Sequence, residues 1–253
     1  MYDQATRRKA LILFASGMSL NQVSRTTGIS RAAIRAWTTR IEPLPGTTSE
    51  CPVPDDHLAS DIPRADYSYL LGLYLGDGCI SHVSKGVYSM RISCSDAWPG
   101  LIDSCADALA HVMPNSKVGR TQCKGCTSVG SYSKHWPCLF PQHGAGPKHA
   151  RAIRLTSWQK EVVSAHPWPL LRGLIHSDGA RVTNWTVRTL ATGVRRYEYP
   201  RYFFSNKSAD IRQLYTATLE SLGVEWRQAN ALNVSVARRA SVALMDEHIG
   251  AKY

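Results

Sequence analysis

Two copies of one short pattern constrain the fold of this chain more than any other feature. LLGLYLGDG occupies residues 70–78, and LRGLIHSDG occupies residues 171–179. After each copy, the pattern of apolar residues predicts two strands, a helix, two more strands and a second helix. A unit that occurs twice in one chain generates two similar halves, which we expect to be related by a pseudo-twofold axis.

The two copies also end alike. Each closes on Gly-x-Lys, and Lys148 follows Asp77 by 71 residues while Lys252 follows Asp178 by 74. Several landmarks at similar spacing make chance similarity a poor explanation. The sequence therefore predicts an α+β fold with a duplicated αββαββα domain.

Small residues recur four positions apart in each copy: Gly72 and Gly76 in the first, Gly173 and Ser177 in the second. Residues at this spacing share one face of a helix, and small side chains there let two helix backbones approach closely. We expect the two helices to pair through these faces. Gly78 and Gly179 stand where a helix C-terminal glycine belongs.

Asp77 and Asp178 end the two predicted helices, where the helix dipole is already negative. If the helices pair, the two carboxylates also face each other, which adds repulsion. A divalent cation would relieve both costs, because carboxylates and helix-terminal carbonyls are hard oxygen ligands suited to Mg²⁺. The alternative is a pair of surface Asp-Gly turns that follow two core helices.

These residues resemble the paired motifs of LAGLIDADG homing endonucleases in their single-chain, two-motif form. The resemblance covers residues 66–253 and implies two curved four-stranded sheets that form a saddle over the DNA major groove. It also implies that Asp77 and Asp178 bind the catalytic metal, Mg²⁺ or another divalent cation. The carbonyls of Gly76 and Ser177 are then further contributors to the metal site.

Lys148 and Lys252 fall where that family places a basic residue near the scissile phosphates. A Lys after Gly-Pro is equally typical of a solvated turn, so both interpretations of these lysines remain open. The chain departs from the motif at its sixth position, where Leu75 and His176 stand in place of the first Asp. His176 either lines the active site or packs at the helix interface.

Residues 1–40 carry seven Lys and Arg against one acid and predict three short helices. The segment LNQVSRTTGISRAAIRAW resembles a helix-turn-helix, with serine caps, a glycine turn, and Arg31 and Arg35 on the exposed face of the recognition helix. In the first helix we expect Leu11, Phe14 and Ala15 to face inward. The alternative is a small helical bundle with a solvated basic face.

Prolines and acidic residues crowd the next segment, which we expect to be an extended linker. The predicted domains are a helix-turn-helix domain at 1–40, a Pro-rich linker at 41–63, a first LAGLIDADG half at 64–160 and a second half at 161–253.

The net charge of +11 and the isoelectric point near 9.5 indicate a polyanionic partner. Basic residues alternate with apolar ones in the predicted strands, a pattern that suits a sheet facing double-stranded DNA. The candidates for DNA contact are Arg91, Arg120, Lys124, Arg181, Arg201 and Arg227. The sequence contains no apolar run long enough to span a membrane and no secretory signal, so we expect a cytoplasmic, nucleoid-associated protein.

Seven cysteines, an odd number without a secretory signal, favour reduced thiols over a disulfide framework. Cys123-Lys-Gly-Cys126 has the spacing of a structural zinc site. The simpler interpretation is a hairpin turn at Lys124-Gly125 that makes the two cysteines cross-strand partners. We therefore regard zinc at Cys123 and Cys126 as the less favoured alternative.

The leading hypothesis is a site-specific, Mg²⁺-dependent endonuclease that acts on double-stranded DNA. We expect a monomer, because the duplication already supplies the twofold axis that single-motif relatives obtain by dimerising. The alternatives are a transcriptional regulator that uses the same fold without cutting DNA, and an RNA-splicing maturase. The regulator would bind a DNA sequence without metal-dependent chemistry at Asp77 and Asp178.

Overall fold

The structure is a computed structural model that describes residues 2–39, 41 and 62–253. Tertiary contacts divide the chain into two compact units, residues 1–50 and 51–253, and each has its own core. Almost all of the predicted linker at 41–63 lies outside the described residues. Within the described ranges, no helix is both long and apolar enough to cross a membrane.

The N-terminal unit contains three helices: α1 (Gln4–Ala15), α2 (Leu20–Thr27) and α3 (Arg31–Thr39). Ser19 caps α2 in a reciprocal capping box with Gln22. Gly28 ends the helix with a left-handed φ of 69°, which a glycine adopts without strain. Ile34 and Trp37 of α3 are buried against Val23 of α2, so the predicted helices and their turn are confirmed.

The prediction for the inner face of α1 is wrong in part. Phe14 is 36% exposed and Ala15 is also exposed, whereas Ala10 is fully buried with Leu11 and Leu13 beside it. The larger side chains of Val23, Ile29, Ile34 and Trp37 are buried in the same small core. A small side chain, Ala10, therefore takes the innermost position on α1 in place of a large one.

The first half of the larger unit follows the predicted order. Its elements are α4 (Arg64–Asp77), β1 (Gly78–Ser84), β2 (Val87–Ser95), α5 (Pro99–Val112), β3 (Val118–Cys123), β4 (Cys126–Ser133) and α6 (Trp136–Leu139). The strands form an antiparallel sheet in the order β1-β2-β4-β3. A short 3-10 helix, η1 (Lys148–Ala150), and α7 (Ser157–Ala165) lead to the second half. The predicted boundary at 160/161 falls inside α7.

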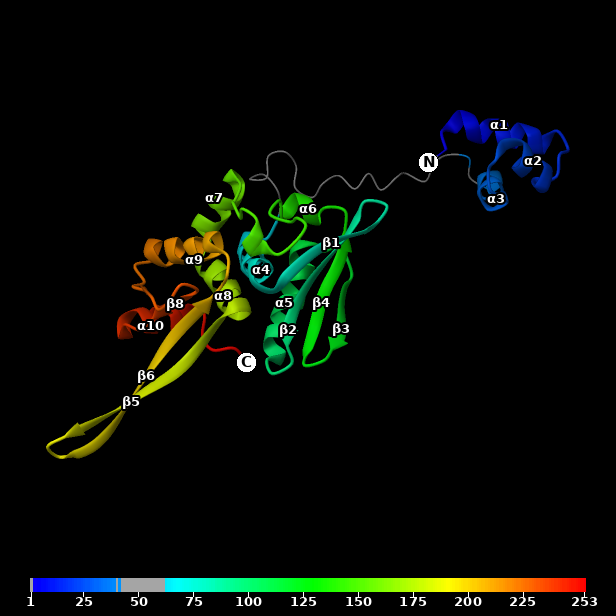
Figure 1. Ribbon diagram of the computed structural model, residues 1–253. Helices are drawn as coiled ribbons and strands as arrows, with labels where there is room; N and C mark the ends of the chain where they lie inside the picture. Colours follow the sequence, from blue (N-terminus) through cyan, green and yellow to red (C-terminus); the bar gives the residue numbers. More distant parts are fainter. Residues whose placement is uncertain (1, 40, 42–61) are drawn as a thin grey trace. The chain divides into compact units, whose positions relative to one another are not determined.

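The second half repeats this order. Its elements are α8 (Pro167–Asp178), β5 (Gly179–Leu190), β6 (Gly193–Ser205), α9 (Ala209–Ser221), β7 (Arg227–Gln228), β8 (Asn233–Val236) and α10 (Arg239–His248). The second sheet has the order β5-β6-β8-β7, which is the order of the first sheet again. Figure 1 shows α4 and α8 side by side between the two sheets. The predicted duplicated αββαββα fold is confirmed.

The pairing register assigns every strand residue to one of two faces. In the first sheet, Met90, Ile92 and Val129 face the helices and are buried, while their neighbours Arg91 and Ser128 point to the other side. In the second sheet, Tyr202 and Phe204 face the helices, as expected for the aromatic core positions of that hairpin. We call the face turned away from the helices the open face of each sheet.

The helices α4 and α8 approach each other closely at two glycines. A Cβ atom added to Gly72 would lie 2.5 Å from the carbonyl oxygen of Leu170, and one added to Gly173 would collide with the carbonyl oxygen of Tyr69. At the next turn, a Cβ at Gly76 would collide with the side chain of Ser177. Helix pairing through the small-residue faces, as predicted, is therefore what the structure contains.

Gly78 and Gly179 stand at the C-cap positions of α4 and α8, as predicted, but with a different backbone conformation from the usual helix-ending glycine. Their φ angles are −85° and −116°, so neither residue adopts the left-handed conformation of a helix C-cap glycine. Each residue is instead the first of a strand that folds back over the helix. A Cβ at Gly78 would lie 2.5 Å from Cα of Tyr74, and one at Gly179 would lie 2.8 Å from Cα of Ile175. Glycine is required at both positions because there is no room for a side chain next to the preceding helical turn, and not because of the backbone conformation.

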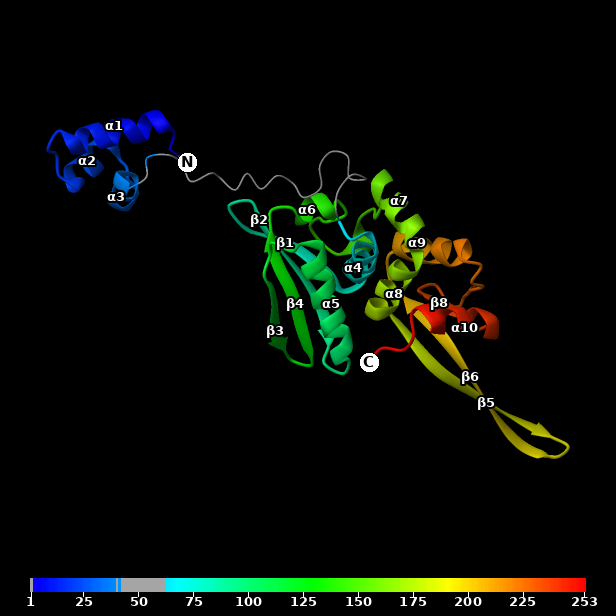
Figure 2. The same cartoon turned by 180° about the vertical axis from the view of Figure 1, so that it is seen from behind.

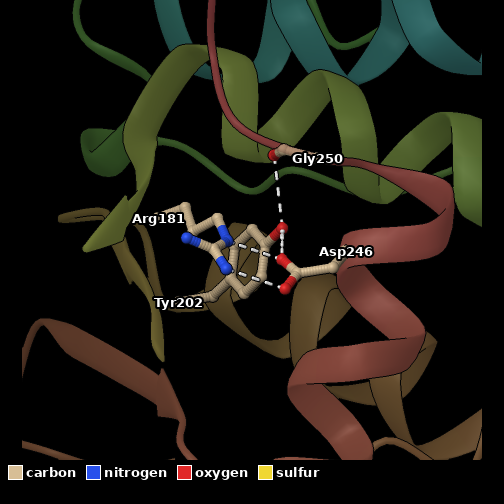
Figure 3. Close-up of polar contacts among 4 residues, drawn as sticks. All are labelled: Arg181, Tyr202, Asp246 and Gly250. Carbon is tan, nitrogen blue, oxygen red and sulfur yellow. Dashed lines mark hydrogen bonds and ion pairs between the residues drawn. The ribbon is translucent and has the colours of Figure 1, made fainter. Parts of the chain in front are cut away.

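A polar cluster ties the long hairpin of the second sheet to its last helix (Figure 3). Arg181 of β5 donates to both carboxylate oxygens of Asp246 on α10, from Nε at 2.6 Å and from Nη2 at 2.8 Å. The hydroxyl of Tyr202 on β6 donates to Oδ1 of Asp246 at 2.7 Å. The Arg181 hydrogen bonds hold the pKa of Asp246 below its usual value.

We expect Asp246→Ala to lower the free energy of unfolding by about 1–2 kcal/mol at neutral pH, because Arg181 and Tyr202 both lose their acceptor. The pKa of Asp246 is lower in the folded state than in the unfolded state. Its contribution to the free energy of unfolding is therefore present above the unfolded-state pKa and is lost as the pH falls through the folded-state pKa. Urea unfolding at pH 7 and below about pH 4 measures both effects, and the difference from wild type should narrow in acid. The control is Glu198→Ala, which removes an ion pair with Arg196 whose side chains are 58% and 54% exposed. An equal loss in both variants would contradict this prediction.

Candidate active site

The pairing of α4 and α8 places the two motif aspartates at the same end of the helix pair. Asp77 is the last residue of α4, and Asp178 is the last residue of α8. The Asp178 oxygen Oδ2 lies 3.1 Å from the position that a Cβ on Gly76 would occupy. The carboxylate of one helix therefore lies beside the final turn of the other, as the repeat predicted.

Each half also brings its own lysine to this point. Lys148 Nζ donates to the carbonyl oxygen of Gly76 at 2.7 Å, and Lys252 Nζ donates to the carbonyl oxygen of Ser177 at 3.3 Å. In both halves the acceptor is the residue directly before the motif aspartate, so the arrangement repeats with the pseudo-twofold symmetry. Both lysines are half-buried, and neither is a solvated turn residue.

The four charged groups form one electrostatic cluster. Burial raises the pKa of Asp77, which the charges of Lys148 and Lys252 partly offset. Burial, followed by repulsion from Asp77, raises the pKa of Asp178 to about 6. Burial lowers the pKa of Lys148 to about 8 and also lowers that of Lys252, against the attraction of both aspartates. Both carboxylates are therefore harder to ionise than a free aspartate, and the charge of Asp77 adds to this effect at Asp178.

The available donors suit a hard divalent cation. They are the Asp77 and Asp178 carboxylates and the carbonyl oxygens of Gly76 and Ser177, and a carbonyl oxygen that accepts one lysine proton keeps a second acceptor position. Magnesium is held in proteins by one or two carboxylates, with waters and substrate phosphates as the other ligands. Among the described residues, no group of three or more His, Cys, Asp or Glu side chains is placed to hold a metal ion. A cation here would thus depend on oxygen ligands beyond the carboxylates.

Asn206 is a member of the site that the sequence analysis missed. Its Nδ2 donates to Asp178 Oδ2 at 2.5 Å, while its own Oδ1 accepts the backbone N–H of Ser208 at 2.7 Å. Asn206 directly follows β6, and Asp96 holds the same place after β2. Asp96 instead accepts hydrogen bonds from Thr127 and Gln122. By register it is not the counterpart of Asn206, because Asn206 lies two residues beyond the partner of Gly179 and that position in the first half is Cys94. The sequence signal that could have pointed to Asn206 was a polar residue directly after the second strand of its half. The motif aspartates Asp77 and Asp178 therefore have different neighbours at this point.

We expect Asn206→Ala to raise the pKa of Asp178 above its value near 6, because the Asn206 hydrogen bond stabilises the ionised carboxylate. Asp77→Asn should lower the same pKa, because it removes the neighbouring negative charge. Carbon-13 NMR of the Asp178 carboxyl group across a pH titration in EDTA measures both shifts. Asn184→Ala, on the open face of the second sheet, is the control and should leave the pKa of Asp178 unchanged. Shifts of the same sign in Asn206→Ala and Asp77→Asn would be inconsistent with this arrangement.

His176 packs at the helix interface. It is 2% exposed, and its Nδ1 lies 2.9 Å from the hydroxyl of Tyr69 on the partner helix α4. Burial lowers the pKa of His176 to about 3, so the ring is neutral at physiological pH. Of the two roles that the sequence left open, the structure supports interface packing.

The structure separates the predicted DNA contacts of the larger unit into two groups. Arg91, Arg201 and Arg227 lie on the open faces of the sheets, and Lys124 lies in the β3–β4 turn. Arg120 and Arg181 lie on the helix-covered faces instead. Arg120 Nη1 pairs with Asp103 of α5 at 2.8 Å, and Arg181 pairs with Asp246. These two arginines therefore point away from the open faces, and their contact with DNA stays a prediction.

Arg31 and Arg35 are exposed on α3 of the N-terminal unit, opposite the buried Ile34 and Trp37. Arg31 Nη1 donates to Asn21 of α2 at 2.9 Å. With Phe14 and Ser19, the two arginines line a hollow at the surface of this unit. Both side chains are therefore accessible to a ligand of the N-terminal unit.

Cys123 and Cys126 are cross-strand partners on either side of a two-residue turn. Gly125 adopts a φ of 76°, which the turn requires. Both cysteines are free thiols. The hairpin interpretation of this CxxC segment is confirmed.

No protein-family model matches the chain, and no curated protein matches its sequence. Among solved structures, the chain is similar to I-DmoI in complex with DNA and Mn, with a TM-score of 0.49 and 17% identity over 75% of this chain and 98% of that one. It is also similar to I-DmoI in complex with DNA and Ca, with a TM-score of 0.48 and 18% identity over 74% and 91% of the two chains. The LAGLIDADG meganuclease I-AabMI bound to uncleaved DNA gives a TM-score of 0.44 and 11% identity over 72% and 82%. The DNA and metal ions belong to those structures, and the chemistry of this chain rests on its own residues.

Proposed function

We propose that this protein is a site-specific endonuclease of the LAGLIDADG homing-endonuclease type, which hydrolyses phosphodiesters of double-stranded DNA with a divalent metal ion. The observation that carries the proposal is the twofold arrangement at the paired helix ends. Each half contributes one aspartate, Asp77 or Asp178, and one lysine, Lys148 or Lys252, at matching positions. Two such sets, related by a twofold axis, suit double-stranded DNA, whose two strands run in opposite directions.

The unfavourable electrostatics support a metal at this point. Burial raises the pKa of both aspartates, and the charge of Asp77 raises that of Asp178 further, so both carboxylates are harder to ionise than a free aspartate. Asp77, Asp178 and the carbonyls of Gly76 and Ser177 would hold the ion, for which we propose Mg²⁺. When bound, a divalent cation stabilises the leaving oxygen of a phosphodiester and lowers the pKa of a water molecule.

The lysines supply charge next to the carboxylates. A protonated Lys148 or Lys252 stabilises negative charge that develops on a phosphate. The pKa of Lys148 is lowered to about 8, so in a fraction of the protein molecules its amine is neutral at mildly alkaline pH. A neutral amine can accept a proton from water. Asn206 orients the carboxylate of Asp178.

We also propose how the other basic residues contribute. Arg91, Arg201 and Arg227 on the open faces, with Lys124 in its turn, would contact the duplex around the cut site. Arg31 and Arg35 of the N-terminal unit would act as a helix-turn-helix that binds DNA separately. Two DNA-binding units joined by a linker raise each other's effective concentration on one DNA molecule. The proposed active form is a monomer.

The test is incubation of the purified protein with a randomised plasmid library, with Mg²⁺ and with EDTA, followed by sequencing of all new DNA ends. We expect Mg²⁺-dependent ends that cluster at one sequence. If the protein enriches a sequence by binding but no metal produces cut ends, the chain is a DNA-binding regulator and the endonuclease proposal is overturned. The same library reports both outcomes.

A further inference from the structure

Helix α5 of the first half begins without a side-chain cap. Its N-cap residue is Trp98, which makes no side-chain hydrogen bond to the first turn. The first N–H groups of a helix have no partner within the helix, so they need an acceptor from elsewhere. For the N–H of Gly100, the second residue of α5, this acceptor is the backbone oxygen of Tyr253 at 3.0 Å. The second half of the unit therefore completes the start of a helix in the first half.

The ring of Tyr253 lies against the same glycine. A Cβ atom on Gly100 would collide with Cε2 and Cδ2 of this ring. Glycine leaves that space free, although it favours a helix less than alanine does. Figure 1 and Figure 2 show the segment that follows α10, drawn in red, ending beside α5. Tyr253 is thus held at the start of α5 by its backbone and by its ring.

The segment held in this way carries Lys252 of the candidate active site. Lys252 Nζ donates to the carbonyl oxygen of Ser177 at 3.3 Å. Up to Gly250 the segment is held by its own half (Figure 3). Beyond that point the contact of Tyr253 with Gly100 fixes the backbone. A segment with few buried contacts opens easily, so the place of Lys252 depends on this contact with the first half.

The lysine segment of the first half is tied across to the second half at the matching place. Asp210 is the second residue of α9, the helix that corresponds to α5, and its Oδ2 accepts the N–H of Ile153 at 2.7 Å. Ile153 follows closely after Lys148. Here Arg151 also donates to two backbone carbonyls of its own half. Lys148 therefore has support from both halves, and Lys252 should be the more sensitive of the two lysines.

We infer that Gly100 and Tyr253 are positioning residues for Lys252, so that helix α5 of the first half holds the lysine of the second half in place. This inference rests on the proposed function, in which Lys252 stabilises charge on a phosphate. One aspartate and one lysine at each helix end would serve one DNA strand. Loss of the contact at Gly100 should therefore slow the cutting of one strand and leave the other strand almost unaffected.

Gly100→Ala separates positioning from folding. The atoms nearest to the new methyl group all belong to the ring of Tyr253, which is 64% exposed and can turn away. Alanine also favours the helix more than glycine does, so the free energy of unfolding should not fall. Tyr253→Ala removes the ring itself, and Tyr253→Phe is the conservative variant that keeps it.

The first measurement needs no DNA. The full-length proteins are treated in EDTA with the N-hydroxysuccinimide ester of acetic acid, and acetylation of Lys252 and Lys148 is followed by peptide mass spectrometry. We expect Lys252 to react about fivefold faster in Gly100→Ala and Tyr253→Ala, the factor for loss of a contact worth one hydrogen bond. Lys148 is the internal control and should react at the wild-type rate. Tyr253→Phe should restore the slow reaction of Lys252.

The second measurement follows cleavage of each strand. The duplex selected by the wild type carries a different dye on each strand and is cut with Mg²⁺ under single-turnover conditions. We expect Gly100→Ala to slow one strand at least about tenfold, because misplacement of a catalytic group by about 1 Å can cost a hundredfold. The other strand of the same duplex is the control, so nicked DNA should accumulate.

An unchanged reaction of Lys252 in Gly100→Ala and Tyr253→Ala, or equal slowing of both strands, would overturn the positioning role. Faster acetylation of both lysines together with a lower free energy of unfolding would overturn it as well, because the contact would then be merely structural. If the wild type cuts no DNA with any metal, the proposed function itself fails. This failure is distinct, since the acetylation measurement does not depend on cleavage.

Discussion

Asp178→Asn is expected to lower the rate of Mg²⁺-dependent DNA cleavage at least about a thousandfold, which corresponds to about 4 kcal/mol of lost transition-state stabilisation. The amide keeps the shape of the side chain and its contact with Asn206 but removes the charge that would hold a cation. Affinity for the duplex in EDTA should fall little or even rise, because the net charge becomes more positive. The measurement is single-turnover cleavage of the selected plasmid site, with binding measured separately in EDTA.

The same substitution should stabilise the fold. Burial and the charge of Asp77 raise the pKa of Asp178 to about 6, so above that pH the ionised carboxylate destabilises the native state. We expect Asp178→Asn to raise the free energy of unfolding by about 1–2 kcal/mol at pH 8. A gain in stability together with loss of cleavage identifies a functional carboxylate, because a structural carboxylate would show the reverse. Urea unfolding of both proteins at pH 8 measures this change.

Asp107→Asn is the matched control. Asp107 is exposed on α5, so removal of its charge should change neither cleavage nor stability beyond about 0.5 kcal/mol. If Asp178→Asn cleaves DNA at a rate within tenfold of wild type, Asp178 is not a ligand of the catalytic metal. In that case the residues that cut DNA would lie elsewhere in the protein.

Gly173→Ala is expected to lower the free energy of unfolding by about 3 kcal/mol or more. The new methyl group would collide with the carbonyl oxygen of Tyr69 and lie 2.9 Å from Cα of Gly72, and both are backbone atoms of the paired helix. Backbone atoms cannot move aside as a flexible side chain can, so α4 and α8 must separate or the helices must bend. Because the helix pair also positions Asp77 and Asp178, cleavage should decline together with stability. Urea unfolding monitored by tryptophan fluorescence measures the loss.

Gly119→Ala provides the control for this experiment. A Cβ at Gly119 on β3 would have only one neighbour, the carbonyl oxygen of Gly130 at 3.9 Å, which is an ordinary contact. Alanine should be neutral or slightly stabilising there, because it reduces the freedom of the unfolded chain. If Gly173→Ala loses no more stability than Gly119→Ala, the close packing of the two helices does not contribute to the fold as we describe.

The repeat in the sequence was enough to predict the core of the candidate site. Asp77 and Asp178 stand at the same place in two copies of one motif, and Lys148 and Lys252 follow at similar distances. In a duplicated fold, equivalent positions become related by the pseudo-twofold axis, so the sequence itself brings the four residues together. The small residues four positions apart in each motif likewise predicted the paired helices. Their catalytic roles stay predictions until cleavage is measured.

The tertiary structure decided which residues share a face and which loops meet. Arg91 and Arg120 looked equivalent in the sequence, but the register of β3 turns Arg120 toward Asp103 on the helix-covered face. A shift of one residue in register exchanges the two faces of a strand, and local sequence does not fix the register. Asn206 reaches Asp178 only because β6 returns beside β5 and ends next to the first residue of that strand. The sequence by itself determined the duplicated fold and its four charged site residues, because periodicity and repetition are properties of the chain. The side on which each arginine points, and the amide that orients one aspartate, depend on strand pairing between distant segments.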